Sequence, residues 1–241
     1  MMYLGQAISP GIACGKAKFL THESAIDQIE NDVDQMEFFH RTLKSVTTAL
    51  EESIDHVKAR LNDRISDIFE TQKMIVNDPI VIQDTINYIS LGMNALEAYT
   101  KTIEQVLTTF QKIDNEYMLG RVVDILDATD KVKAALQGSV ENMFSAYSED
   151  VILVLDQPKP SVIYSTGRNH IVGFVSAQGF YHQHSGMIAR AINVPGIVYG
   201  NILKIIKDND IIIINGDTGE LLINPNDEEK NKFYGGIEHE L

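Results

Sequence analysis

One stripe of apolar residues in the first half of the chain has the spacing of an amphipathic helix. Its members are separated by three or four residues, or by sums of these steps, and they are Ile29, Val33, Met36, Leu43, Leu50, Ile54, Val57 and Leu61. Between Gly15 and Gly92 the only Gly or Pro is Pro79, so little interrupts a helix there. His40 and Thr47 fall in gaps of the stripe, and we interpret His40 as a core histidine and not as a ligand.

Further helices follow this first one. A second is expected over about residues 65–76, and Asp78 and Pro79 provide an N-cap and a first helical position for a third. Residues 93–111 and 116–136 predict two more, the first opened near Asn94 and the second ended by Gly138. The pattern therefore predicts an all-helical domain over residues 22–147.

The two flanks have a different pattern, that of short β-branched strands between turn residues. These strands are expected at residues 150–156, 171–175, 196–199, 211–214 and 221–223, with a hairpin turn at 215–219. Residues 3–20 also look extended, but so short a segment cannot bury a core of its own and must pair with the later strands. We therefore predict an α/β domain of residues 1–20 plus 149–225, interrupted by the helical domain, with a linker or tail at 226–241.

The charge of the chain narrows the choice of partner. The formal net charge is -14, and residues 21–148 hold 22 acidic and 11 basic residues. Such a surface disfavours nucleic acid and anionic membranes as partners, and it favours a basic protein. A merely solvated helix surface is the alternative interpretation.

The single cysteine and the N-terminus bear on localisation. Cys14 has no second cysteine to pair with, and the first residues show neither a basic region nor an apolar run typical of a signal peptide. The most apolar stretch, 211–214, is far too short to span a bilayer. We expect a cytoplasmic protein without membrane insertion.

The chemistry is concentrated around His184. Small and apolar residues follow it over 185–192, which predicts that His184 lies at or just before a helix N-terminus, a position that favours an anion. A neutral imidazole is a competent nucleophile near pH 7, so His184 is a candidate phosphoryl carrier. A helix cap or a plain surface residue is the alternative.

These residues resemble a known family. The string from His184 through Arg190 to 194–198 is similar to the phosphohistidine signature of enzyme I, the phosphoenolpyruvate-protein phosphotransferase of the bacterial sugar phosphotransferase system. Residues 5–17, 68–79, 115–127 and 215–225 resemble its opening strands, its two helical signatures and its closing hairpin. The resemblance covers the N-terminal half of that family alone. It implies a swivelling phosphohistidine α/β domain interrupted by an inserted helical-hairpin bundle.

The resemblance also implies a function and its residues. His184 would receive phosphate from the family's C-terminal barrel, which binds phosphoenolpyruvate and magnesium, and would pass it to the phosphocarrier protein HPr. No cofactor is expected on these 241 residues. Arg190 is interpreted as a supporting residue. The positions that match the family's HPr-docking surface are Glu70, Met74, Ile75, Phe110, Tyr117, Met118 and Arg121, with core packing as the alternative for the apolar ones.

The chain departs from the family near the histidine. Phe180, His182 and Gln183 replace part of a Gly-Gly-x-Thr-Ser segment, and Ile163 stands where the family has a threonine near the ring. Gln72 stands where the first helical signature carries His. Two alternatives therefore stay open: an HPr-docking or regulatory module that has lost efficient transfer, and a metal-binding protein that uses His182 and His184, with His170 as a third ligand.

Overall fold

The computed structural model describes residues 2–20, 34–110, 116–138, 147–166, 170–179 and 183–235, with the side chains of 110, 116–120, 232, 234 and 235 excepted. The chain forms two compact units, one of Met1–Thr21 with Phe144–Leu241 and the other of His22–Met143. It passes between them within residues 21–33 and 139–146, which lie outside the described residues, so the exact limits of the domains stay predictions. No described helix is long and apolar enough to cross a membrane.

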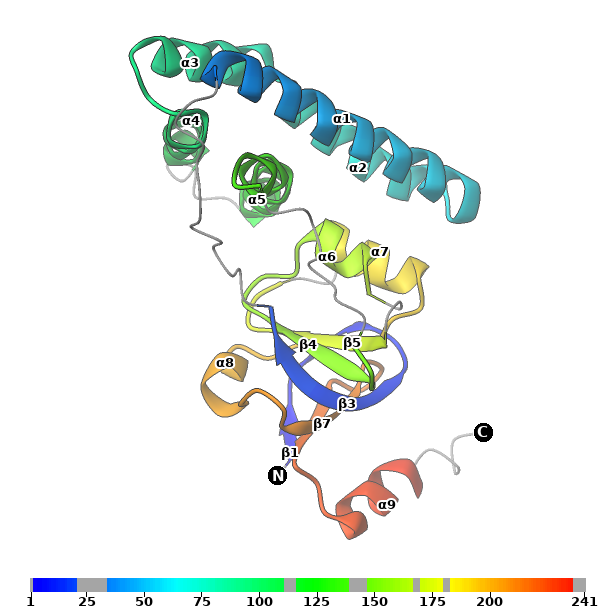
Figure 1. Ribbon diagram of the computed structural model, residues 1–241. Helices are drawn as coiled ribbons and strands as arrows, with labels where there is room; N and C mark the ends of the chain where they lie inside the picture. Colours follow the sequence, from blue (N-terminus) through cyan, green and yellow to red (C-terminus); the bar gives the residue numbers. More distant parts are fainter. Residues whose placement is uncertain are drawn as a thin grey trace. The chain divides into compact units, whose positions relative to one another are not determined.

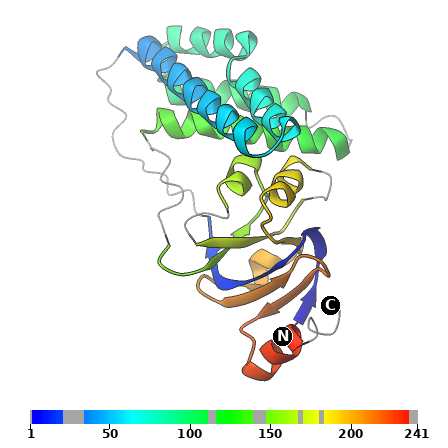
Figure 2. The same ribbon diagram turned by 90° about the vertical axis from the view of Figure 1, so that its right-hand side faces the viewer.

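The described part of the helical unit contains the expected helices (Figure 1). They are α1 (Gln35–Arg60), α2 (Asp63–Val76), α3 (Pro79–Ser90), α4 (Ala95–Phe110) and α5 (Glu116–Leu136). Helices α1 and α2 run side by side as a hairpin, which Figure 2 shows from a second direction. The predicted helical insertion is confirmed.

Side chains at the N-termini explain where these helices begin. At the start of α1, the Oδ1 atom of Asp34 accepts hydrogen bonds from the N–H groups of Met36 and Glu37. At the start of α2, Oδ1 of Asn62 accepts a hydrogen bond from the N–H of Ile65. Asp78 caps α3, and Pro79 occupies the first turn, as predicted. Each cap satisfies helix-end donors that would otherwise lack a partner, a contribution of about 1 kcal/mol.

The interpretation of His40 as a core histidine is wrong. His40 is exposed, and its Nδ1 lies 2.9 Å from the carbonyl oxygen of Met36. The neighbouring Phe39 is fully buried and carries the apolar stripe from the first turn to Leu43. Consecutive residues such as Phe39 and His40 lie about 100° apart around a helix. This angle is enough to separate a buried position from an exposed one. Ile29 and Val33, the first members of the predicted stripe, lie outside the described residues.

The second unit is built on an eight-stranded mixed sheet in the described residues. The strands are β1 (Met2–Leu4), β2 (Gln6–Ser9), β3 (Ile12–Phe19), β4 (Val151–Leu155), β5 (Ile171–Ser176), β6 (Gly196–Val198), β7 (Ile211–Asn215) and β8 (Glu220–Ile223). Their order is β1-β8-β7-β3-β4-β5-β6-β2. The pairs β3–β4, β4–β5 and β5–β6 are parallel, and the other pairs are antiparallel. The three N-terminal strands thus pair with late ones, as predicted.

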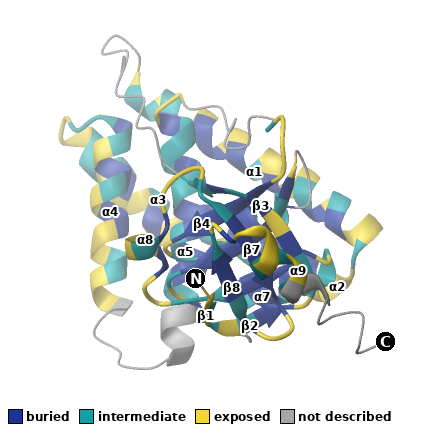
Figure 3. Ribbon diagram, turned by 90° about the horizontal axis from the view of Figure 1, so that it is seen from below, coloured by how far each residue is buried: buried dark blue, intermediate teal, exposed yellow. Residues whose placement is uncertain are grey.

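Helices complete this unit. They are α6 (Pro160–Tyr164), α7 (His184–Ala191), α8 (Ile202–Ile205) and α9 (Asp227–Gly235). Figures 1 and 2 both show α6 and α7 next to each other over one face of the sheet. All five residues of β4 are buried, as expected for a parallel strand covered on both faces. Figure 3 shows the centre of the sheet mostly in the dark blue of buried residues.

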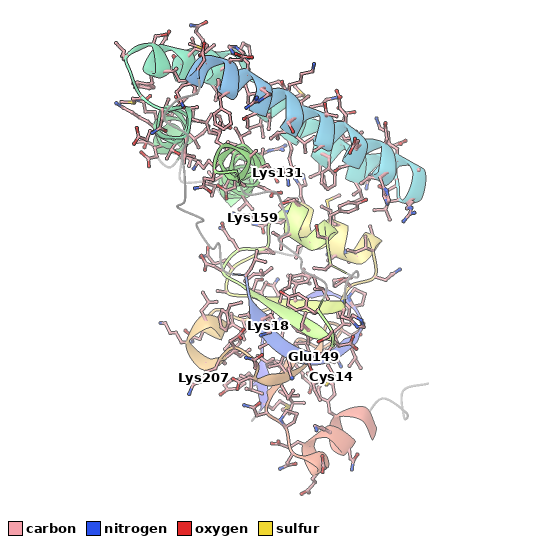
Figure 4. The ribbon with its side chains drawn as sticks, viewed as in Figure 1. Cys14, Lys18, Lys131, Glu149, Lys159 and Lys207 are labelled. Atoms are coloured by element: carbon pink, nitrogen blue, oxygen red, sulfur yellow. The ribbon has the colours of Figure 1, made fainter. Side chains whose placement is uncertain are left out.

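Strand β3 alternates between the core and an outer face. Ala13 and Ala17 are buried, whereas Cys14 is exposed and the outer lysines form ion pairs. Lys16 Nζ lies 2.6 Å from Glu149 Oε1, and Lys18 Nζ lies 2.9 Å from Asp208 Oδ2. Figure 4 labels Cys14, Lys18 and Glu149 among these outer side chains. The ion pairs join β3 to the segments that lead into β4 and β7.

Candidate functional site

His184 is the first residue of α7, which confirms its predicted position at a helix start. The preceding Gln183 is the N-cap and has extended backbone angles, φ −69° and ψ 158°. The N–H of Met187 bonds back to the carbonyl oxygen of Gln183 at 3.1 Å, which closes the first turn of the helix. The His184 side chain is half-buried. A group bound to its ring would therefore lie near the positive end of the helix dipole and remain accessible.

The body of α7 is anchored firmly in the unit. Ile188 and Ala189 are fully buried, so this face of the helix packs into the interior. Nη1 of Arg190 donates a hydrogen bond of 2.7 Å to the carbonyl oxygen of Ile8. This bond ties the C-terminal end of α7 to β2. In the first turn, Ser185 and Gly186 are also buried, and His184 is half-buried.

The chain that leads to His184 is held at the end of β4. The N–H of Ala177 donates to the carbonyl oxygen of Leu155, and that of Gln178 donates to Asp156, each at 2.9 Å. Gly179 has φ +138°, and a Cβ there would lie 3.1 Å from Cγ of Pro158. Glycine therefore suits this position through both its backbone angle and its close packing. Phe180 and His182 lie outside the described residues.

Ile163 lies in α6 and is fully buried. Its side chain has no donor or acceptor, so position 163 cannot supply the hydrogen bond that a threonine would offer to the histidine ring. Whether transfer is slowed by this change stays a prediction.

The described side chains add no support to the hypothesis of a metal site at His170, His182 and His184. Among them, no three His, Cys, Asp or Glu residues are grouped closely enough to hold a metal ion. Nδ1 of His170 lies 3.0 Å from Oδ1 of Asp150, which makes this histidine part of a surface ion pair when protonated. His182, the other proposed ligand, lies outside the described residues.

The candidate docking residues of the helical unit differ in their surroundings. Met74 is 73% exposed, a large value for an apolar side chain, and Ile75 is half-buried. Arg121 Nη1 lies 3.7 Å from Asp124 Oδ2. The side chains of Phe110, Tyr117 and Met118 lie outside the described residues, so their place in a docking surface stays a prediction.

Glu70 is paired with cations of its own unit. Its two carboxylate oxygens lie 3.1 Å from Nζ of Lys73 and 3.2 Å from Nζ of Lys58. Hydrogen bonds from Lys73 and then Lys58 lower the pKa of Glu70, so it is ionised at neutral pH. A partner that binds Glu70 with a cation must share it with these two lysines.

Gln72 has a second feature that the sequence analysis missed. It is fully buried, and its Nε2 donates a hydrogen bond of 2.6 Å to Oδ2 of Asp127 on α5. A signal for its burial was present, because Gln72 continues the helical spacing of Ile65, Ile68 and Phe69 on the inner face of α2. No pattern in the sequence indicated that Asp127, on a helix distant in the chain, would be its hydrogen-bond partner.

Comparison with known proteins matches both parts of the chain. Residues 4–121 match the family described as PEP-utilising enzyme, N-terminal, and residues 147–219 match PEP-utilising enzyme, mobile domain. The phosphoenolpyruvate-protein phosphotransferase of Priestia megaterium is 28% identical over 232 residues, and that of Staphylococcus carnosus is 29% identical over 229 residues. Each alignment covers 93% of this chain and 40% of the relative's length.

Solved structures show the same likeness. An NMR solution structure of an Enzyme I protein superposes with a TM-score of 0.69 at 26% identity, covering 98% of both chains. The N-terminal domain of an Enzyme 1 – Nitrogen protein superposes with a TM-score of 0.61 at 17% identity, a likeness of fold alone. The sheet interrupted by a helical bundle, the two matched domains and the phosphotransferase relatives agree, and the chain belongs to the enzyme I family, of which it is an N-terminal region.

Proposed function

We propose that this chain relays a phosphoryl group, which it accepts on His184 and passes to the histidine of an HPr-like phosphocarrier protein. One observation carries the proposal: His184 is the first residue of α7 in the region that matches the mobile domain of PEP-utilising enzymes. The relatives that bear the name phosphoenolpyruvate-protein phosphotransferase support the direction of this transfer.

The transfer needs a nucleophilic ring nitrogen and a site for the anionic group. A neutral ring nitrogen of the HPr histidine attacks the phosphorus on phosphorylated His184 as the bond from phosphorus to the His184 nitrogen breaks, and the His184 imidazole takes the electron pair of that bond. Labelling of His184 by phosphorylated HPr is the same step in reverse. The positive end of the α7 dipole stabilises the charge on the phosphoryl oxygens. Since donor and acceptor are both imidazoles, positioning by a docked partner supplies most of the rate acceleration.

The helical unit supplies the partner surface in this proposal. Its acidic excess favours a basic protein, and exposed Met74 provides apolar contact area next to charged Glu70. Phosphoenolpyruvate and magnesium are assigned to a separate barrel, as in the family. Among the described residues, no three His, Cys, Asp or Glu side chains are grouped to hold a metal ion. That these residues bind no cofactor stays a prediction, and the proposed transfer is written without a metal.

Supplying two phosphoryl donors separately tests the proposal. We expect the chain to be labelled by phosphorylated HPr but not by phosphoenolpyruvate with magnesium, because a phosphohistidine donor needs no cationic site for an enolate. The label should be acid-labile and base-stable, should map to His184 by mass spectrometry, and should be absent from His184→Ala. Labelling by phosphoenolpyruvate alone would show that a donor site lies on this chain.

A second candidate is a docking or regulatory module without efficient transfer. The buried, apolar Ile163 at the position of an expected orienting threonine favours it. Calorimetry of HPr binding, read together with the labelling of His184, separates the two candidates. Binding of HPr without any phosphate on His184 would support the docking module and contradict the relay.

A further inference from the structure

A buried side-chain hydrogen bond joins α2 to α5. Gln72 is fully buried and Asp127 is 2% exposed, and 2.6 Å separate Nε2 of Gln72 from Oδ2 of Asp127. The inner face of α2 is otherwise formed largely by apolar side chains, among them Ile68, Phe69 and Val76. A buried carboxylate is tolerated only with donors close to it, so the carboxamide of Gln72 stabilises Asp127.

This contact is not the arrangement of highest stability. The Oε1 atom of Gln72 is buried and has no hydrogen-bond partner. Burying an unpartnered amide oxygen is unfavourable, and two apolar side chains would fill the same space without that penalty. What the polar pair provides is geometric: the hydrogen bond forms at one rotation and one axial position of α2 on α5. Apolar contacts discriminate between such registers far less sharply.

The outer side of α2 carries candidate docking residues. Glu70 and Met74 each lie two positions from Gln72, which is about 200° around the helix. Met74 is exposed, whereas Gln72 is fully buried, so the two residues lie on opposite faces of α2. A rotation or a shift of α2 on α5 would therefore move Glu70 and Met74 together.

We propose that Gln72 is a positioning residue for partner docking: its hydrogen bond to Asp127 sets the rotation and register of α2 on α5, and thereby the geometry of Glu70 and Met74. The docking part of this inference rests on the proposed function, whereas the packing part does not. Gln72 contacts neither the partner nor the phosphoryl group, so its effect is on binding and not on the chemical step.

Gln72→Met tests the inference, since methionine has a similar length and no donor. In the proposed transfer from phosphorylated HPr, we expect the half-saturating HPr concentration to rise about fivefold or more. The rate at saturation should stay within about twofold of the wild type, which is the signature of lost binding without a lost chemical contact. Gln72→His keeps a ring N–H for Asp127, and we expect it to restore at least half of the affinity lost in Gln72→Met.

Thr85→Val is the matched control. Thr85 is also fully buried in the helical unit, and its hydroxyl donates to the carbonyl oxygen of Val81 at 2.8 Å. It lies on α3, which carries none of the candidate docking residues. We expect Thr85→Val to lower the unfolding temperature without changing the half-saturating HPr concentration. An equal loss of HPr affinity in both variants would show that general destabilisation, and not positioning by Gln72, causes the effect.

Amide hydrogen exchange and chemical shifts test the packing without any partner. In Gln72→Met we expect faster exchange in α2 than in α3, with shift changes at Glu70 and Met74, and in Thr85→Val we expect the reverse order. Unchanged exchange and shifts along α2 in Gln72→Met would overturn the inference. If the wild-type chain does not bind HPr at all, the proposed function fails, and this measurement still decides whether Gln72 sets the position of α2.

Discussion

His184 and His182 are two positions apart, yet they are not equivalent candidates for the phosphoryl group. His184 is the first residue of α7, a position at the positive end of the helix dipole, which favours an anion. His182 lies outside the described residues. We predict that His184→Ala abolishes labelling by phosphorylated HPr, whereas His182→Ala only reduces it. Mass spectrometry of the labelled peptide measures both. Phosphate on His182 of the wild type would contradict the assignment.

Ile163 offers a test of the missing hydroxyl. In Ile163→Thr, we expect faster transfer to His184, because the new hydroxyl can orient the ring and favour one tautomer. The same change places a polar group at a fully buried position, and we expect it to lower the free energy of unfolding by about 1–3 kcal/mol. Rapid-quench kinetics and denaturant unfolding measure the two effects. Ile163→Val controls for the altered shape and should not raise the rate.

At the scale of elements, the turn between α2 and α3 depends on one cap. Asp78 Oδ1 accepts hydrogen bonds from Ile80 at 2.8 Å and from Val81 at 3.2 Å. We predict that Asp78→Ala lowers the free energy of unfolding of the helical unit by about 1 kcal/mol. Asp84→Ala, at an exposed position within the same helix, is the control and should change it by less than about 0.5 kcal/mol. Equal losses in urea unfolding would show that the cap is not the cause.

The segment that enters β7 should respond to acid. Asp210 accepts hydrogen bonds from the Asn224 side chain and from the N–H of Lys207, and these bonds lower its pKa below the usual 3.8. A lowered folded-state pKa adds stability above the unfolded-state value, and this stability is lost as the pH falls through the folded-state pKa. We predict that Asp210→Asn loses less stability than the wild type on acidification below about pH 4. Parallel pH dependences of the two unfolding temperatures would contradict this.

At the scale of the whole molecule, the charge is concentrated on one segment. Residues 21–148 carry 22 of the 34 acidic residues, and at physiological ionic strength such fields are screened over about 8 Å. We predict that the affinity for HPr and the rate of association both fall as the salt concentration is raised. We also predict that the chemical-shift changes on titration with HPr occur in the helical unit. Changes confined to residues 150–225, or an affinity independent of salt, would contradict the proposed docking surface.

Local patterns in the sequence determined most of the elements. The breaker-free stretch, Asp78 with Pro79, and the β-branched runs are local signals, because caps and periodicity act over a few residues. They predicted the helices of the inserted unit, most strands and the helix start at His184. They missed the short helices α6 and α8, and they gave residues 226–241 as a linker or tail, where the structure has α9. They also implied that residues 3–20 pair with late strands, since so short a segment has no other way to bury its apolar side chains.

Tertiary structure decided what depends on contacts between distant residues. Phe39, and not His40, faces the interior, because the packing of α1 selects between neighbouring positions that the spacing leaves nearly equivalent. The bond of Gln72 to Asp127 spans 55 residues, and that of Arg190 to Ile8 spans 182. Periodicity places a side chain on a face of its own helix, but which distant residue meets that face depends on how the elements pack.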